Sequence, residues 1–332
     1  MHDRLGALDE WLRATLAGAK FHLEPASADA SFRRYFRVFL DEGRTLVAMD
    51  APPQHENSEP FVRIAKMFRD AGLNAPEVLA QDLAKGFLLL GDLGTRSYLA
   101  ALRAENFDAL MGDATTALVK WQAATRPGVL PEYDEALLRR ELSLFPDWYI
   151  ARHLGIELSG RQREALEGVF RSILASNLAE PRVYVHRDYM PRNLMVCDPN
   201  PGILDFQDAV HGPISYDIAC LYRDAFVSWD EERVLDGTIR YWEKARRAGL
   251  PVRADFSDFW RDVEWMGLQR HLKVAGIFAR LYYRDGKPLY LADTPRFIGY
   301  IRHAVQRYND LAPLGHLLDS LEGREPQVRY TF

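Results

Sequence analysis

The chain has 332 residues, 48% of them hydrophobic, which is enough for two domains or for one large domain with two lobes. Its formal net charge of -5 argues against nucleic acid or an anionic membrane surface as the main partner. Its two cysteines, Cys197 and Cys220, have no zinc-binding spacing and are expected to be free thiols in a reducing cytoplasm.

The first residues predict an amphipathic helix, because Leu5, Leu8, Trp11, Leu12 and Leu16 recur on one face. The apolar core of a signal peptide is missing, and no later segment has the apolar length that spans a bilayer. We therefore expect a cytoplasmic protein with no membrane partner. We also expect a monomer.

Up to residue 91 the sequence predicts a small lobe of mixed strand and helix. The expected elements are a turn at Ser31 leading into a strand that reaches Val38, a strand at 45–49, a helix at 59–71 stopped by Gly72, and a strand at 86–90. The stretch Gly91–Gly94 then breaks the apolar run and predicts a hinge.

The remainder predicts a larger, mainly helical lobe. Helical periodicity is expected at 107–125, 135–152 with a kink at Pro146, 161–177, 216–226, 231–248, 256–283 and 295–311. Short strands are expected at 183–185, 194–196 and 203–204. The sequence thus predicts an α+β protein with an N-lobe at 1–91 and a C-lobe at 92–332, and a cleft between two such lobes is a natural ligand site.

The run His186–Asn193 fits the template H-R-D-x-x-x-x-N, and Asp205 follows an apolar strand-like segment. These positions match the needs of phosphoryl transfer. Asp188 is predicted to receive the proton of an acceptor hydroxyl, and Asn193 and Asp205 are predicted to hold Mg²⁺ through oxygen atoms.

Two further polar residues are predicted to support this run. His186 is interpreted as a hydrogen-bonded core residue rather than a catalytic acid. Asp217 stands at the start of a helix, where it serves either as an N-terminal cap or as a brace for the catalytic loop.

The catalytic run, the Leu204–Phe206 segment and the helix start Tyr216–Ala219 resemble the aminoglycoside phosphotransferase family, over most of the chain. Within that family the sequence is most similar to the anomeric N-acetylmuramate/N-acetylglucosamine kinases. The closer likeness lies in Met49–Pro53, His186–Val196, Cys220–Phe226 and Gln269–Arg280.

This resemblance implies a two-lobed, protein-kinase-like fold, with ATP and Mg²⁺ as cofactors and a small amino sugar as the substrate. The implied reaction phosphorylates the C1 hydroxyl of the sugar in peptidoglycan recycling. The N-lobe would bind the nucleotide, with the adenine against the hinge near Leu90, Asp92 and Leu93. The C-lobe would carry the catalytic loop, the metal ligands and the sugar site.

The N-lobe departs from the kinase pattern at Met49, where kinases of this fold usually carry a lysine for the α- and β-phosphates. The loop between residues 27 and 35 also contains no glycine. We hypothesise that Arg33, Arg34 or Arg37 supplies the missing charge, and we favour Arg34 or Arg37. The alternative is that these arginines only form a solvated strand edge.

The stretch 266–287 holds five basic residues against Asp285 alone, which disfavours a polycationic aminoglycoside. Arg270 and Lys273 are predicted to suit the carboxylate of N-acetylmuramate, although a solvated helix face is the alternative. Trp148 and Tyr149 would stack on a sugar ring, unless they are core residues. The remaining substrate candidates are Arg192, Arg223 and Asp224.

Two rival functions remain open from the sequence. One is another small-molecule kinase of the same fold, acting on an aminoglycoside, choline or homoserine. The other is a nucleotide-binding regulator without catalysis, suggested by Met49 in place of lysine. The intact set of Asp188, Asn193 and Asp205 argues against the second, since a regulator has no physical need for it.

Overall fold

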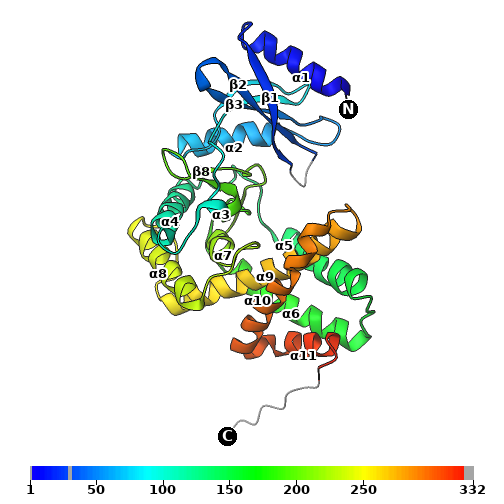
Figure 1. Ribbon diagram of the computed structural model, residues 1–332. Coiled ribbons are helices and arrows are strands. Elements are labelled where there is room, and N and C mark those ends of the chain that lie inside the picture. Colours follow the sequence, from blue (N-terminus) through cyan, green and yellow to red (C-terminus); the bar gives the residue numbers. More distant parts are fainter. Residues whose placement is uncertain (1, 29–31, 325–332) are drawn as a thin grey trace. The chain divides into compact units, whose positions relative to one another are not determined.

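The computed structural model describes residues 2–28 and 32–324, whose elements are labelled in Figure 1. The chain divides into two compact units: unit 1 is Met1–Trp121 with Pro191–Ala209, and unit 2 is Gln122–Met190 with Val210–Phe332. Unit 1 is therefore built from two separate stretches of chain. The lobes expected at 1–91 and 92–332 stay a prediction, since the compact units have other bounds.

Unit 1 contains a five-stranded antiparallel sheet with the strand order β1-β2-β3-β5-β4. The strands are β1 Phe21–Ala28, β2 Arg34–Leu40, β3 Thr45–Asp50, β4 Val78–Asp82 and β5 Phe87–Gly91. The helix α1 (His2–Thr15) contributes Leu8 and Leu12 to one hydrophobic cluster with Val38 and Phe87 of the sheet. The predicted N-terminal helix is thus confirmed, while Ser31 of the expected turn lies outside the described residues.

Helix α2 (Glu59–Asp70) buries Phe61, Ile64 and Phe68 on one face, as its 3.6-residue spacing predicts. It stops before Gly72, whose φ of 72° lies in the left-handed region that favours glycine. The predicted helix and its stop signal are both confirmed.

The other elements of unit 1 are short, apart from α4. They are η1 Asp41–Gly43, α3 Tyr98–Ala101, α4 Phe107–Ala123 (whose last two residues count with unit 2), η3 Pro191–Asn193, β7 Leu194–Met195 and β8 Gly202–Ile203. Strands β7 and β8 pair antiparallel and form a small hairpin.

Unit 2 is mainly helical and contains one two-stranded antiparallel ladder between β6 and β9. Its elements are α5 Glu135–Leu144, π-helix η2 Phe145–His153, α6 Gly160–Leu178, β6 Arg182–Val185, β9 Val210–Pro213, α7 Tyr216–Tyr222, α8 Glu231–Arg247, α9 Phe256–Tyr283, η4 Pro288–Asp293, α10 Thr294–Arg307, η5 Asn309–Leu311 and α11 Ala312–Leu321.

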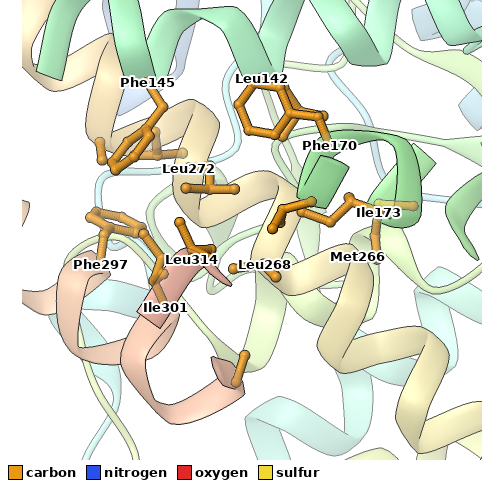
Figure 2. Packing of buried hydrophobic residues seen from close by; sticks show 14 of the residues in the cluster. Leu142, Phe145, Phe170, Ile173, Met266, Leu268, Leu272, Phe297, Ile301 and Leu314 are labelled. Carbon is orange, nitrogen blue, oxygen red and sulfur yellow. The ribbon is translucent and has the colours of Figure 1, made fainter. Parts of the chain in front are cut away.

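The long helix α9 forms the centre of unit 2 and packs against α5, α6, α7 and α10. Figure 2 shows Leu268 and Leu272 of α9 among apolar side chains from the neighbouring helices, including Phe145, Phe170 and Phe297. Such burial is the main favourable contribution to the stability of the unit. It also fixes the orientation of the polar residues that α9 carries.

Three predicted helices differ from those observed. The helix expected at 135–152 is α5 followed by a π-helix, and Pro146 lies in the first turn of that π-helix, where its missing N–H interrupts the α-helical ladder. The helix expected at 216–226 ends at Tyr222, and the one at 295–311 is divided into α10 and η5. Among the described residues, no helix combines the length and apolar character needed to cross a membrane.

Candidate active site

The predicted catalytic loop, His186–Met190, follows strand β6 in unit 2 and is held by a buried carboxylate. Asp217, in the first turn of α7, is fully buried and accepts hydrogen bonds from the backbone N–H groups of His186 at 2.7 Å and Arg187 at 3.0 Å. The N–H of Asp188 donates to His186 Nδ1 at 3.2 Å. These contacts favour the supporting roles predicted for His186 and Asp217.

Arg187 has a left-handed backbone with a φ of 77°, a conformation that costs a non-glycine residue about 1–2 kcal/mol. Its carbonyl accepts a hydrogen bond from Cys220 Sγ at 3.4 Å, and its guanidinium pairs with Glu141 at 2.6 Å and lies over the ring of Tyr133. Strain of this kind persists only where the surroundings fix the residue. Asp188 therefore follows a residue that is held through both its backbone and its side chain.

Two carboxyl groups near the loop have shifted pKa values for different reasons. Burial raises the pKa of Asp217 to about 7, against the two amides that donate to it. Burial also raises the pKa of Glu141, but the charges of Lys273 and Arg187 outweigh this effect and bring it to about 2. Glu141 is thus ionised at neutral pH, whereas Asp217 titrates there.

A short hairpin in unit 1 brings Asn193 and Asp205 together. The strands β7 and β8 pair, and the N–H of Leu204 donates to the carbonyl of Asn193 at 2.9 Å. Asn193 Nδ2 lies 3.3 Å from Asp205 Oδ2, and Gln207 Nε2 donates to Asp205 Oδ1 at 2.8 Å. A carboxylate beside an amide is a set of hard oxygen donors that fits Mg²⁺.

Unit 2 contains another group that could in principle bind a metal, formed by Glu231, Glu264 and His303 with ligand atoms within 4.8 Å of one another. Arg307 donates to Glu264 at 2.6 Å and to Glu231 at 3.3 Å, and Arg223 also pairs with Glu231. The carboxylates are already balanced by arginine, so this cluster is best described as an ion-pair network.

Arg33 and Arg34, two of the candidates for nucleotide binding, form ion pairs within unit 1. Arg33 lies 2.9 Å from Glu56. Arg34 of β2 pairs with Asp50, its direct cross-strand partner in β3, and Arg4 binds the same buried carboxylate. Asp50 thus has two arginine partners, and Arg34 contributes charge next to the strand where the lysine is missing.

Arg37, the third candidate, is bidentate to Asp92 with contacts of 2.6 and 3.2 Å. Burial raises the pKa of Asp92, but the hydrogen bonds from the Arg37 side chain and from the backbone N–H of Gly94 lower this pKa to a greater extent. The carboxylate is therefore ionised. Arg37 therefore fixes the segment where Leu90, Asp92 and Leu93 were predicted to bind adenine. Met49 is fully buried in the sheet.

Trp148 and Tyr149 lie on the π-helix η2 and are both half-buried. The ring of Tyr149 stacks on Phe145, with centroids 5.2 Å apart, and packs against the main core of unit 2. Tyr149 thus already has an aromatic partner inside the protein.

Arg223, Asp224 and Arg270 lie next to one another in unit 2. Arg270, only 2% exposed, donates to the carbonyl of Arg223 at 3.0 Å. Asp224 is fully buried, and its Oδ2 accepts hydrogen bonds from two backbone N–H groups that follow it, at 2.7 and 2.9 Å. Its Oδ1 has no hydrogen-bond partner among the described residues. Arg192, the remaining candidate, is half-buried in η3 of unit 1.

Lys273 is buried and paired, which the sequence did not predict. Its Nζ lies 2.9 Å from Glu141 Oε1 and donates to Tyr216 OH at 3.0 Å. Glu141 itself was missed, although the sequence contains a signal: it falls between Leu138 and Leu142 on the apolar face of α5. A charged residue at such a position is buried only when it is paired.

The chain is similar to known proteins along most of its length. Residues 22–256 match the phosphotransferase enzyme family. An N-acetylmuramate/N-acetylglucosamine kinase of Pseudomonas aeruginosa is 57% identical over 299 residues, which cover 90% of this chain and 88% of that protein. A kinase of the same name from Neisseria meningitidis serogroup B is 50% identical over 330 residues, 98% of each chain.

Solved structures show the same fold. The crystal structure of an ADP-bound aminoglycoside phosphotransferase, APH(2'')-Ib, superposes with a TM-score of 0.61 at 15% sequence identity. The match covers 90% of this chain and 98% of that one. The predicted protein-kinase-like α+β fold, with a small sheet and a larger helical part, is thereby confirmed.

Proposed function

We propose that this chain, which belongs to the phosphotransferase enzyme family, is an ATP-dependent kinase that phosphorylates the C1 hydroxyl of N-acetylmuramate and N-acetylglucosamine in peptidoglycan recycling. The observation that carries the proposal is the 57% and 50% identity, over nearly the whole chain, to kinases named for these two sugars. The polar groups that phosphoryl transfer requires are also present at Asp188, Asn193 and Asp205.

Asp188 is the proposed general base. It accepts the proton of the sugar hydroxyl as the hydroxyl oxygen attacks the γ-phosphorus of ATP, and ADP leaves. Asp217 and His186 support this role, since their hydrogen bonds fix the backbone on the N-terminal side of Asp188.

Asn193 and Asp205 are the proposed ligands of Mg²⁺. Their side chains lie within hydrogen-bond distance of one another, and Gln207 orients the Asp205 carboxylate. The bound cation would neutralise charge on the phosphates of ATP.

The nucleotide is proposed to bind at unit 1. Arg33, Arg34 and Arg37 are the nearby cations, and Leu90, Asp92 and Leu93 form the segment that would contact adenine. The contacts of Arg37 with Asp92 support a role in ordering this segment.

The residues proposed to bind the sugar that accepts the phosphate are the candidates that the sequence indicated. They are Trp148, Tyr149, Arg192, Arg223, Asp224, Arg270 and Lys273. Because the relatives are named for one acidic and one neutral sugar, we propose that these residues serve both sugars and that no one cation is reserved for the acidic one.

Phosphorus NMR of the product tests the function directly. The purified protein is incubated with Mg²⁺-ATP and each sugar in turn, and a sugar 1-phosphate is the expected product. A sugar 6-phosphate would refute the proposed position of transfer. Turnover of an aminoglycoside, choline or homoserine, without turnover of either amino sugar, would support the rival kinase. ATP binding without transfer to any acceptor would support the regulator.

A further inference from the structure

Glu141 of α5 is a buried carboxylate to which nothing in the proposed mechanism gives a role. It is 5% exposed, and both of its oxygens have two donors. Oε1 contacts Arg187 at 2.6 Å and Lys273 at 2.9 Å, while Oε2 accepts hydrogen bonds from Gln269 at 3.1 Å and from Tyr133. Such complete pairing is what allows a carboxylate to remain ionised inside a protein.

The partners of Glu141 come from separate parts of unit 2. Arg187 belongs to the catalytic loop, whereas Lys273 and Gln269 belong to α9. Lys273 also donates to Tyr216 at the start of α7, next to the residue that holds the loop backbone. One side chain therefore joins the catalytic loop to two packed helices and, through Lys273, to a third.

Arg187 is an unusual residue to find at its position. Its left-handed backbone, with a φ of 77°, suits glycine, yet the chain carries a long cationic side chain there. That side chain is anchored at its far end by Glu141 and lies over the ring of Tyr133. The anchored guanidinium thus compensates the strain and restricts the loop at the residue before Asp188.

We propose that Glu141 is a positioning residue, which holds Arg187 and thereby fixes Asp188 in the orientation needed for proton abstraction. This inference rests on the proposed function. Glu141 acts on the rate of transfer through Arg187 and makes no contact with ATP or with the sugar.

The first test is Glu141→Gln, which keeps the size of the side chain and removes its charge. We expect kcat with N-acetylglucosamine to fall about 10²-fold, because small displacements of a catalytic group have effects of this size, while the KM for ATP is unchanged. The matched control is Glu167→Gln on α6, which breaks an ion pair with Arg139 of 2.5 Å and is predicted to keep the wild-type kcat.

Glu141→Gln removes the charged partner of both Arg187 and Lys273, and the variant fails to fold if these buried cations are not tolerated unpaired. A second variant tests the proposal in that case. In Arg187→Gly the glycine accepts the left-handed backbone, and Glu141 keeps Lys273 as its partner. We expect the same loss of kcat. Where the double variant Glu141→Gln/Arg187→Gly folds, its kcat should be no lower than that of either single variant. Both substitutions break the same ion pair between Glu141 and Arg187, so their effects should not add.

The outcomes separate this inference from the proposed function. A wild-type protein that transfers phosphate to neither sugar overturns the function and the inference with it. If the wild type is active, a wild-type kcat in folded Glu141→Gln or in folded Arg187→Gly overturns the inference alone. So do losses that multiply in the double variant, because two independent sites would then be involved.

Discussion

The ammonium group of Lys273 lies 2.9 Å from Glu141 Oε1, so the cation expected beside an acidic sugar already has a carboxylate partner. Lys273→Met is therefore predicted to lower kcat/KM for N-acetylmuramate and for N-acetylglucosamine by a similar factor. Steady-state kinetics with both sugars measure this ratio. A loss confined to N-acetylmuramate would instead show that Lys273 binds the lactyl carboxylate.

Asp188→Asn is predicted to lower kcat by about 10²–10⁴-fold, the usual contribution of a general base. The amide is nearly isosteric with the carboxylate but cannot accept the proton of the acceptor hydroxyl. ATP affinity, measured by calorimetry, should persist because the base does not hold the nucleotide. Undiminished turnover would contradict the assignment of Asp188.

Asp205→Asn is predicted to raise the Mg²⁺ concentration needed for half-maximal rate and to lower kcat. The change removes the negative charge from the pair formed with Asn193 and leaves only amide oxygens for the cation. The measurement is the rate as a function of Mg²⁺ at fixed ATP. Asp198→Asn, in the exposed connection between β7 and β8, is the matched control and should leave the Mg²⁺ dependence unchanged.

Arg37→Met is predicted to raise the KM for ATP by about tenfold, the equivalent of about 1.4 kcal/mol of binding. The variant loses both contacts with Asp92 and thus the order of the segment proposed to hold adenine. Arg13→Met, which breaks an exposed ion pair with Asp9 on α1, is the control. A KM for ATP equal to that of the wild type would contradict a role of Arg37 in nucleotide binding and leave it only a role in stabilising the sheet.

Glu180→Gln is predicted to stabilise the protein at pH 8 and to have no effect near pH 4. Burial, aided by the negative charge of Asp262, raises the pKa of Glu180 well above its usual 4.5. As the pH rises, the carboxyl of Glu180 therefore loses its proton at a lower pH in the unfolded chain than in the folded protein. The free energy of unfolding of the wild type falls as the pH rises above 4.5. Glutamine does not ionise, so the variant does not lose this stability. Thermal unfolding at both pH values should show a gain of about 1–3 kcal/mol at pH 8 only.

Periodicity predicted most helices because burial on one face leaves a direct mark in the sequence, as in α2. It did not predict β1, because the segment Phe21–Ala28 includes Pro25 and has only Phe21 and Leu23 as large apolar residues, so its formation depends on pairing with β2. The short strand β4, with the sequence VLAQD, also lacks a clear alternation of apolar and polar residues. Strand pairing is a long-range property, and a local window does not contain it.

The sequence placed Asn193 and Asp205 as partners because motif spacing reflects chain geometry, and the hairpin β7–β8 brings them together. It could not show that Lys273 is neutralised, since Glu141 lies far away in the chain. The role of a charged residue depends on which opposite charge it meets, and that choice is made only by tertiary packing.

The discontinuity of unit 1 has a consequence for biosynthesis. Phe206 comes from its second stretch, yet its ring lies 4.9 Å from Phe61 and 5.4 Å from Phe68 of the first. The ribosome must therefore synthesise the second stretch of unit 1, which ends at Ala209, before the packing between Phe206 and α2 can form. The apolar face of α2 therefore packs against a segment that is synthesised late, and a nascent chain halted before Asn193 would lack the ring of Phe206 on this face.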